Sequence, residues 1–94
     1  MRENRVKQVM ADGKLALGTY VTFADPQVVE IIGLAGYDAA FIDMEHTTFD
    51  LALVTEMIRA ADLAGVTSIV RVPDNDEKLI LRLLAVSYTH LLAH

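Results

Sequence analysis

Residues 39–46 read AAFIDMEH, an apolar run that ends abruptly in two acids and a histidine. A short continuous apolar run is typical of a strand that is buried on both faces of a parallel sheet. Open α/β sheets and α/β barrels place their chemistry at the carboxyl ends of such strands. Histidine changes charge near neutral pH, so His46 beside two carboxylates is a candidate general base. On spacing alone, a plain loop explains the stretch at least as well, with Asp43 and Glu45 opening it and His46 capping it.

The sequence on both sides of this stretch alternates between helix-like and strand-like patterns. Asp25 and Pro26 are typical of the N-cap and first residue of a helix, and the spacing from Thr47 to Asp50 predicts a capping box. Gly18, inside a β-rich run, indicates either a bulge or a close approach to a ligand. We expect a short helix over 3–11, and then strand and helix pairs at 15–22 and 26–36, 39–43 and 51–65, and 67–72 and 77–84.

Strands that are separated by a single crossover helix are parallel, because the helix returns the chain to the same end of the sheet. The three carboxyl ends then share one rim, which brings residues 23–25, the 43–46 group and Arg71 into one neighbourhood. Arg71 follows an apolar run, where a buried guanidinium needs a partner. Its fork of donors matches a carboxylate or an enolate oxygen. A structural ion pair with Asp43 or Glu45 and a substrate-binding role both fit the sequence.

Composition bounds the class of protein. The 94 residues make at most one domain, and a small one. The apolar fraction of 53% is high for a soluble domain, which indicates surfaces that more protein should cover. The chain contains no cysteine, so disulfides and thiolate metal sites are excluded. A net charge of −5 without a basic cluster argues against nucleic acid and anionic membranes. Without a signal-peptide pattern or a membrane-length apolar run, we expect a cytoplasmic protein with a small-molecule ligand or none.

Three motifs together resemble the opening of the HpcH/HpaI aldolase family: GLAGYD at 33–38, FIDMEH at 41–46 and VRVP at 70–73. The likeness runs from about residue 5 to residue 84. It implies an α/β fold that forms the first three βα units of a (β/α)8 TIM barrel, preceded by a short N-terminal helix. Such a barrel needs roughly 250 residues, so the barrel is incomplete in this chain. The resemblance also implies a metal-dependent pyruvate aldolase, a carbon–carbon lyase that cleaves a 4-hydroxy-2-oxo acid into pyruvate and an aldehyde.

The resemblance assigns a role to each ionisable residue of the motifs at 41–46 and 70–73. His46 is the catalytic base that handles the hydroxyl proton, and Arg71 binds the substrate at the pyruvate carbonyl or enolate oxygen. Asp43 and Glu45 take supporting roles. The family's metal ligands come from later strands, so no metal ligand is expected in this chain, although the parent protein would use Mg²⁺ or Mn²⁺. We expect a homo-oligomeric parent whose partner is a small 2-oxo acid, with no nucleic acid or membrane.

The chain departs from the family pattern after residue 84. The family carries Leu-Asp-x-Gly-Ala after the third helix, and its aspartate orients the catalytic histidine, whereas residues 85–87 read AVS. We therefore divide the chain into a barrel part, 1–84, and a tail, 85–94, which resembles translated adapter sequence and which we interpret as an artefact. Two alternatives to the aldolase stay open. The chain as it stands is a catalytically inert fragment, or its parent is a lyase of the citrate-lyase or malyl-CoA-lyase type.

Overall fold

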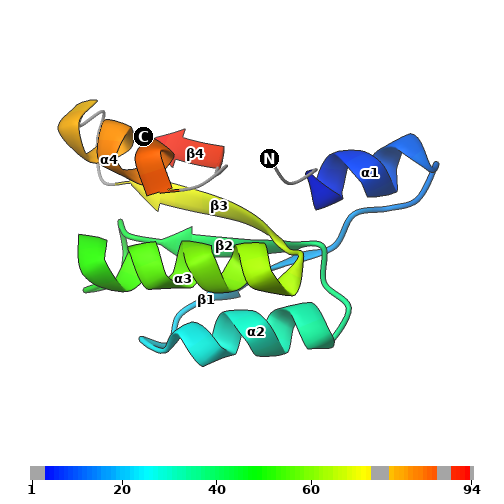
Figure 1. Ribbon diagram of the computed structural model, residues 1–94, viewed down its shortest axis with the longest axis horizontal. Coiled ribbons are helices and arrows are strands. Elements are labelled where there is room, and N and C mark those ends of the chain that lie inside the picture. Colours follow the sequence, from blue (N-terminus) through cyan, green and yellow to red (C-terminus); the bar gives the residue numbers. More distant parts are fainter. Residues whose placement is uncertain (1–3, 73–76, 87–89, 94) are drawn as a thin grey trace.

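The computed structural model of the protein describes residues 4–72, 77–86 and 90–93, and shows helices packed on a parallel sheet (Figure 1). Within this part of the chain, no helix is both long and apolar enough to cross a membrane. The elements follow in the order α1 (Arg5–Ala11), β1 (Gly18–Val21), α2 (Pro26–Leu34), β2 (Ala39–Asp43), α3 (Leu51–Ala64), β3 (Thr67–Val72), α4 (Glu77–Val86) and β4 (His90–Ala93).

The sheet has the strand order β1-β2-β3-β4, and each neighbouring pair is parallel. This confirms the predicted α/β fold, in which a helix follows each of the first three strands and a short helix precedes them. Because the order in space follows the order in sequence, every crossover helix connects two adjacent strands. The carboxyl ends of β1, β2 and β3 therefore lie along the same rim.

A fourth strand, β4, was not predicted. It lies within the tail that the sequence pattern placed outside the fold, and it pairs with β3 so that His90 is aligned with Ile69. An edge strand carries a row of backbone donors and acceptors that a further strand can satisfy whatever its side chains are. Backbone pairing of this kind leaves little trace in a sequence pattern.

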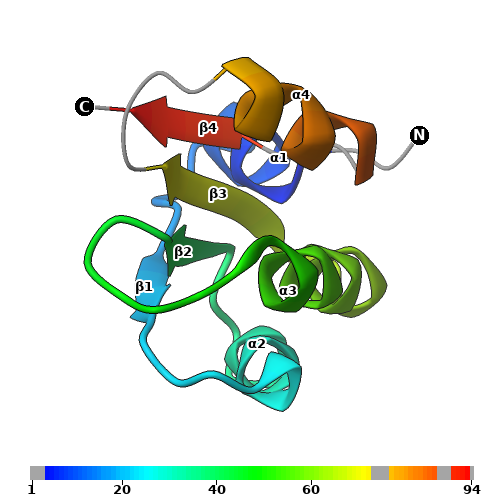
Figure 2. The same cartoon turned by 90° about the vertical axis from the view of Figure 1, so that its left-hand side faces the viewer.

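The two faces of the sheet differ in what covers them. α2 and α3 pack side by side on one face, as Figure 2 shows, and the fully buried residues Val21, Ile42 and Val70 lie beneath them at aligned positions of β1, β2 and β3. Side chains alternate between the two faces along a strand, so Tyr20 and Phe41 point to the other face. The core lies between the sheet and the helices, and the opposite face is more open.

The helix α1 is fixed at the amino ends of the strands by Asp38, a buried carboxylate just before β2. Its Oδ1 accepts from Arg5 Nε at 3.0 Å and its Oδ2 accepts from Leu17 N at 2.9 Å. The hydrogen bond from Leu17 N, together with Arg5, lowers the pKa of Asp38 although burial opposes this. A second contact joins Val6 N to Thr67 Oγ1 at 3.2 Å. α1 thus closes the end of the sheet opposite to Asp43.

The start of α3 corrects one prediction. The N-cap is Asp50, whose Oδ1 accepts from Leu53 N at 2.8 Å, so a capping box that begins at Thr47 is wrong. The helix begins at Leu51, which places Thr47 three residues before the N-cap. The Thr47 hydroxyl instead donates to the backbone carbonyl of Asp43 and accepts from Phe49 N. The threonine therefore shapes the loop between β2 and α3.

Gly18 does not mark a bulge, because β1 and β2 pair in regular register from Gly18 and Ala39 onward. A Cβ atom at Gly18 would lie 2.8 Å from Cε2 of Phe41 and 3.2 Å from Cβ of Ala39. The close neighbour of this glycine is therefore the ring of Phe41, which occupies the space that a side chain at position 18 would take.

Candidate active site

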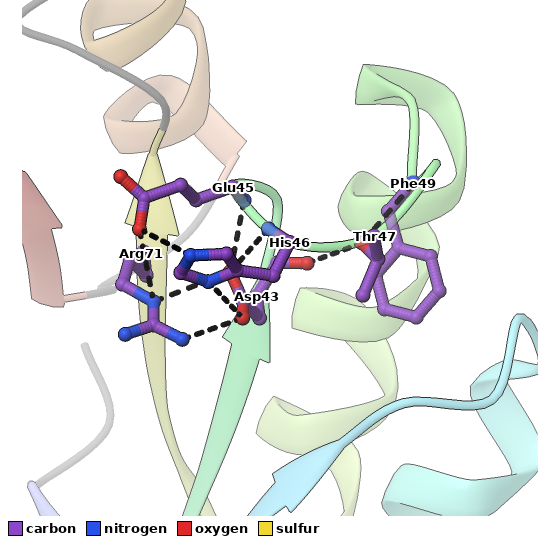
Figure 3. A network of polar contacts seen from close by, with 6 residues as sticks. All are labelled: Asp43, Glu45, His46, Thr47, Phe49 and Arg71. Carbon is purple, nitrogen blue, oxygen red and sulfur yellow. Dashed lines mark hydrogen bonds and ion pairs between the residues drawn. The ribbon is translucent and has the colours of Figure 1, made fainter.

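Four ionisable side chains meet at the carboxyl ends of β2 and β3: Asp43, Glu45, His46 and Arg71 (Figure 3). Asp43 is the last residue of β2 and is aligned with Arg71 in β3. Glu45 and His46 follow in the loop after β2. The prediction that His46 and Arg71 share one rim, with Asp43 near Arg71, is confirmed.

Arg71 and Asp43 form a two-point ion pair. Nη2 of Arg71 lies 2.6 Å from Oδ2 of Asp43, and Nε lies 3.2 Å from Oδ1. The side chain of Asp43 is 8% exposed and that of Arg71 is 26% exposed. The hydrogen bonds from Arg71 hold the pKa of Asp43 well below its usual range, although burial opposes this, and Asp43 in turn raises the pKa of Arg71. Both groups are therefore ionised at neutral pH, and the ion pair expected from the sequence is present.

The carboxylate of Asp43 also folds the loop that follows it. Oδ1 accepts from the backbone N–H groups of Glu45 at 2.8 Å and of His46 at 3.1 Å. A short acid can bond the backbone two residues further on, which turns the chain sharply. The interpretation that Asp43 opens the following loop is therefore correct. The turn that Asp43 stabilises brings His46 back toward the rim.

His46 lies between two carboxylates. Its Nδ1 is 3.2 Å from Oδ2 of Asp43 and its Nε2 is 3.4 Å from Oε1 of Glu45, while the side chain is 63% exposed. A neutral imidazole that donates from Nδ1 to a carboxylate carries its lone pair on Nε2. Asp43 thus contacts one ring nitrogen of His46, and Glu45 faces the other.

An aromatic pair on the open face borders this cluster. The ring of Tyr20 lies 5.7 Å from Cζ of Arg71, and its centroid is 5.2 Å from that of Phe41. Tyr20 was not predicted from the sequence, because its proximity to Arg71 depends on the register between strands. Asp25 from the first loop, expected in the same neighbourhood, is used as the N-cap of α2 and accepts from Gln27 N at 2.9 Å.

The described residues do not fit a metal site by themselves. Among them, no group of three or more histidine, aspartate or glutamate side chains could hold a metal ion. Both carboxylate oxygens of Asp43 already accept hydrogen bonds from Arg71 and from the His46 loop. Glu45 and His46 alone would offer too few ligands for a divalent ion that prefers six oxygen ligands.

Parallel βα units with an ionisable cluster at the strand ends are typical of α/β barrels and of open α/β sheets. The family profile described as HpcH/HpaI aldolase/citrate lyase matches residues 16–92. The chain therefore belongs to the HpcH/HpaI aldolase/citrate lyase family, as its motifs indicated.

Among curated relatives, the 5-keto-4-deoxy-D-glucarate aldolase of Citrobacter koseri is 30% identical over 95% of this chain and 35% of its own length. The aldolase of the same name from Klebsiella pneumoniae is 29% identical over the same shares. The chain thus spans about a third of the length of the curated relatives it matches.

Solved structures also support membership of this family. Citrate synthase SbnG superposes with a TM-score of 0.86 at 27% identity, covering 97% of this chain and 37% of that protein. The HpcH/HpaI aldolase from Desulfitobacterium hafniense superposes with a TM-score of 0.80 at 29% identity, covering 90% and 33%. The fold is therefore that of the first βα units of an HpcH/HpaI barrel, as predicted. The division of the chain after residue 84 stays a prediction.

Proposed function

We propose that this chain contributes the acid–base and oxyanion-binding part of the active site of an aldolase that cleaves a 4-hydroxy-2-oxo acid into pyruvate and an aldehyde. One observation carries the proposal: Asp43 holds a histidine and an arginine side by side on one rim. The likeness to aldolases of the family supports it. Because the chain spans about a third of these relatives, the activity belongs to the parent barrel.

His46 is the proposed general base. In the tautomer that this proposal assigns, the Nδ1–H group of His46 donates a hydrogen bond to Asp43, and Nε2 removes the proton from the C4 hydroxyl. The C3–C4 bond then breaks, the aldehyde leaves, and the electron pair moves through C3 and C2 onto the carbonyl oxygen, which gives the enolate of pyruvate. Protonation of that enolate at C3 completes pyruvate, and the reverse sequence gives condensation.

Arg71 is the proposed substrate-binding residue. Its Nε and Nη2 point to Asp43, which leaves the N–H groups of Nη1 for the oxygen of the substrate. A guanidinium that is already fixed by a carboxylate stabilises the negative charge of an enolate without having to reorganise. Glu45 has a supporting role in this proposal, since its Oε1 lies 3.7 Å from Nε of Arg71 and 3.4 Å from Nε2 of His46.

We further propose that the parent barrel uses Mg²⁺ or Mn²⁺ and takes the metal ligands from strands beyond this chain. The parent is proposed to be a cytoplasmic homo-oligomer whose partner is a small 2-oxo acid. The residues 85–94 are proposed to be a tail outside the family's own sequence, although the family profile extends to residue 92.

A second candidate is a carbon–carbon lyase or synthase that acts on citrate-like acids. The superposition with citrate synthase SbnG favours it, because that protein matches this chain over 97% of its residues. Both reactions form an enolate as an intermediate, so the proposed roles of His46 and Arg71 fit either reaction. The difference between the two lies in the partner of the enolate, which residues outside this chain contact.

The test is a substrate panel on the complete parent protein. Pyruvate release is measured from 4-hydroxy-2-oxo acids of several lengths and compared with the cleavage of citrate and malyl thioesters, each with Mg²⁺, with Mn²⁺ and after chelation. We expect pyruvate release only from the 4-hydroxy-2-oxo acids. If the protein cleaves citrate or a malyl thioester and none of the 4-hydroxy-2-oxo acids, the second candidate function would replace the proposed aldolase function.

A further inference from the structure

Tyr20 reaches the candidate active site from a strand that does not adjoin Arg71. β1 carries Tyr20 and β3 carries Arg71, with β2 between them in the sheet. The ring of Tyr20 nevertheless lies 5.7 Å from Cζ of Arg71, so the side chain spans β2 on the open face. A guanidinium within about 6 Å of an aromatic centroid is attracted by the electron-rich face of the ring.

The position of the Tyr20 ring is set by its own neighbours. Its centroid lies 5.2 Å from that of Phe41, at an interplanar angle of 33°. Phe41 fits there because Gly18 has no side chain, since a Cβ at that position would meet the Phe41 ring at 2.8 Å. Gly18 thus leaves room for the Phe41 ring, which contacts the Tyr20 ring, and the Tyr20 ring in turn contacts the guanidinium of Arg71.

Asp43 and Tyr20 restrain Arg71 in different ways, in addition to the longer contact between its Nε and Oε1 of Glu45 at 3.7 Å. Asp43 bonds Nε and Nη2, which fixes one edge of the guanidinium. The guanidinium could still rotate about that edge or move toward solvent, because the side chain of Arg71 is 26% exposed. A ring against the guanidinium opposes both movements and leaves the Nη1 edge directed away from Asp43.

We propose that Tyr20 is a positioning residue that holds the guanidinium of Arg71 in its substrate-facing orientation. The catalytic consequence rests on the proposed function, whereas the positioning rests on the geometry of Tyr20, Phe41 and Arg71 alone. The aromatic face of Tyr20 is what acts on Arg71, and the hydroxyl is not needed for this role.

The kinetic test uses the complete parent protein with Tyr20→Phe and Tyr20→Leu. Tyr20→Phe keeps the ring and should retain kcat within about twofold. Tyr20→Leu keeps an apolar side chain without a π face and should lower kcat about tenfold, with a smaller change in KM, because the enolate forms only during turnover.

In an Arg71→Lys background, where the fork with Asp43 is lost, Tyr20→Leu should lower kcat by a markedly smaller factor. An equal loss in both backgrounds means a merely structural role and overturns the proposal.

A chemical readout separates this proposal from the proposed function. Phenylglyoxal labels arginine, and the rate at Arg71 can be followed by peptide mapping, with the exposed Arg59 as an internal control. We expect several-fold faster labelling of Arg71 in Tyr20→Leu than in Tyr20→Phe, and no change at Arg59. That result in a parent without aldolase activity would reject the proposed function and support the positioning. Unchanged labelling and unchanged kcat in Tyr20→Leu overturn the positioning, and Tyr20→Met takes its place if Tyr20→Leu does not fold.

Discussion

Nη2 of Arg71 lies 2.6 Å from Oδ2 of Asp43, although 28 residues separate the two along the chain. The same oxygen of Asp43 lies 3.2 Å from Nδ1 of His46. One carboxylate therefore fixes both the proposed base and the proposed oxyanion-binding group. Since β2 and β3 align Asp43 with Arg71, the parallel register of the sheet is what creates this arrangement.

Asp43→Asn should disrupt both functions at once. The amide has nearly the same size, but its NH₂ group would face a donor of Arg71 in either orientation, because Arg71 donates to both oxygens of Asp43. We expect kcat of the parent protein to fall by at least about 10²-fold. Asp25→Asn is the matched control, because asparagine caps a helix as well as aspartate does and Asp25 serves as the N-cap of α2. Similar turnover of wild type and Asp43→Asn would contradict the shared role of this carboxylate.

His46→Ala should depress aldol cleavage by about 10²–10⁴-fold, the usual loss on removal of a general base. Metal binding should be largely unchanged, because in our proposal the ligands lie on later strands. Steady-state kinetics and a Mn²⁺ titration of the same preparation measure the two properties. Turnover like that of the wild type would remove His46 from the mechanism, and a lost Mn²⁺ site would make it a ligand.

Arg71→Lys should also be damaging, because an ammonium cannot bond both oxygens of Asp43 and a substrate oxygen in one plane. We expect a large loss in kcat for the parent protein, and partial recovery of Arg71→Ala on addition of guanidinium ion. Arg59→Lys on α3 is the control, since Arg59 pairs with the exposed Glu56 three residues away. A substitution that leaves kcat intact would reduce Arg71 to a structural partner of Asp43.

The sequence was sufficient to predict which residues share the rim, but not which residues surround them. The meeting of Asp43 and Arg71 follows from the crossover rule, which needs only the order of strands and helices. The contact of Tyr20 with Arg71 needs the register between strands, which a single chain does not display. Asp38 was seen only as part of a motif, because its burial depends on α1 folding back so that Arg5 reaches it.

Acid should release the contacts that Asp38 makes. Its pKa is lowered in the folded protein, so its contribution to stability is present above the ordinary pKa of 3.8 and is lost as the pH falls below that value. We therefore expect Asp38→Asn to lower the Tm of the parent at pH 7, and the difference from wild type to shrink steadily toward pH 3. Glu30→Gln, an exposed carboxylate on α2, should leave the Tm nearly unchanged at either pH. A Tm difference for Asp38→Asn that does not depend on pH would mean that the carboxylate charge contributes nothing.

The 94-residue chain alone should show no aldolase activity and should not behave as a well-folded monomer. The sheet ends in two edge strands, and large apolar side chains are uncovered on both of its sides, which promotes association. Those on the open face include Tyr20, and those on α2 and α3 are Ile31, Leu34 and Leu63.

Added Mg²⁺ or Mn²⁺ should not restore activity to this chain, since the described residues offer no cluster of metal ligands. Size-exclusion chromatography, a thermal scan and a pyruvate-release assay with both metals measure the three properties. A monodisperse monomer with a cooperative transition would contradict the prediction about folding. Metal-dependent pyruvate release would show instead that His46, Asp43 and Arg71 suffice without the later strands.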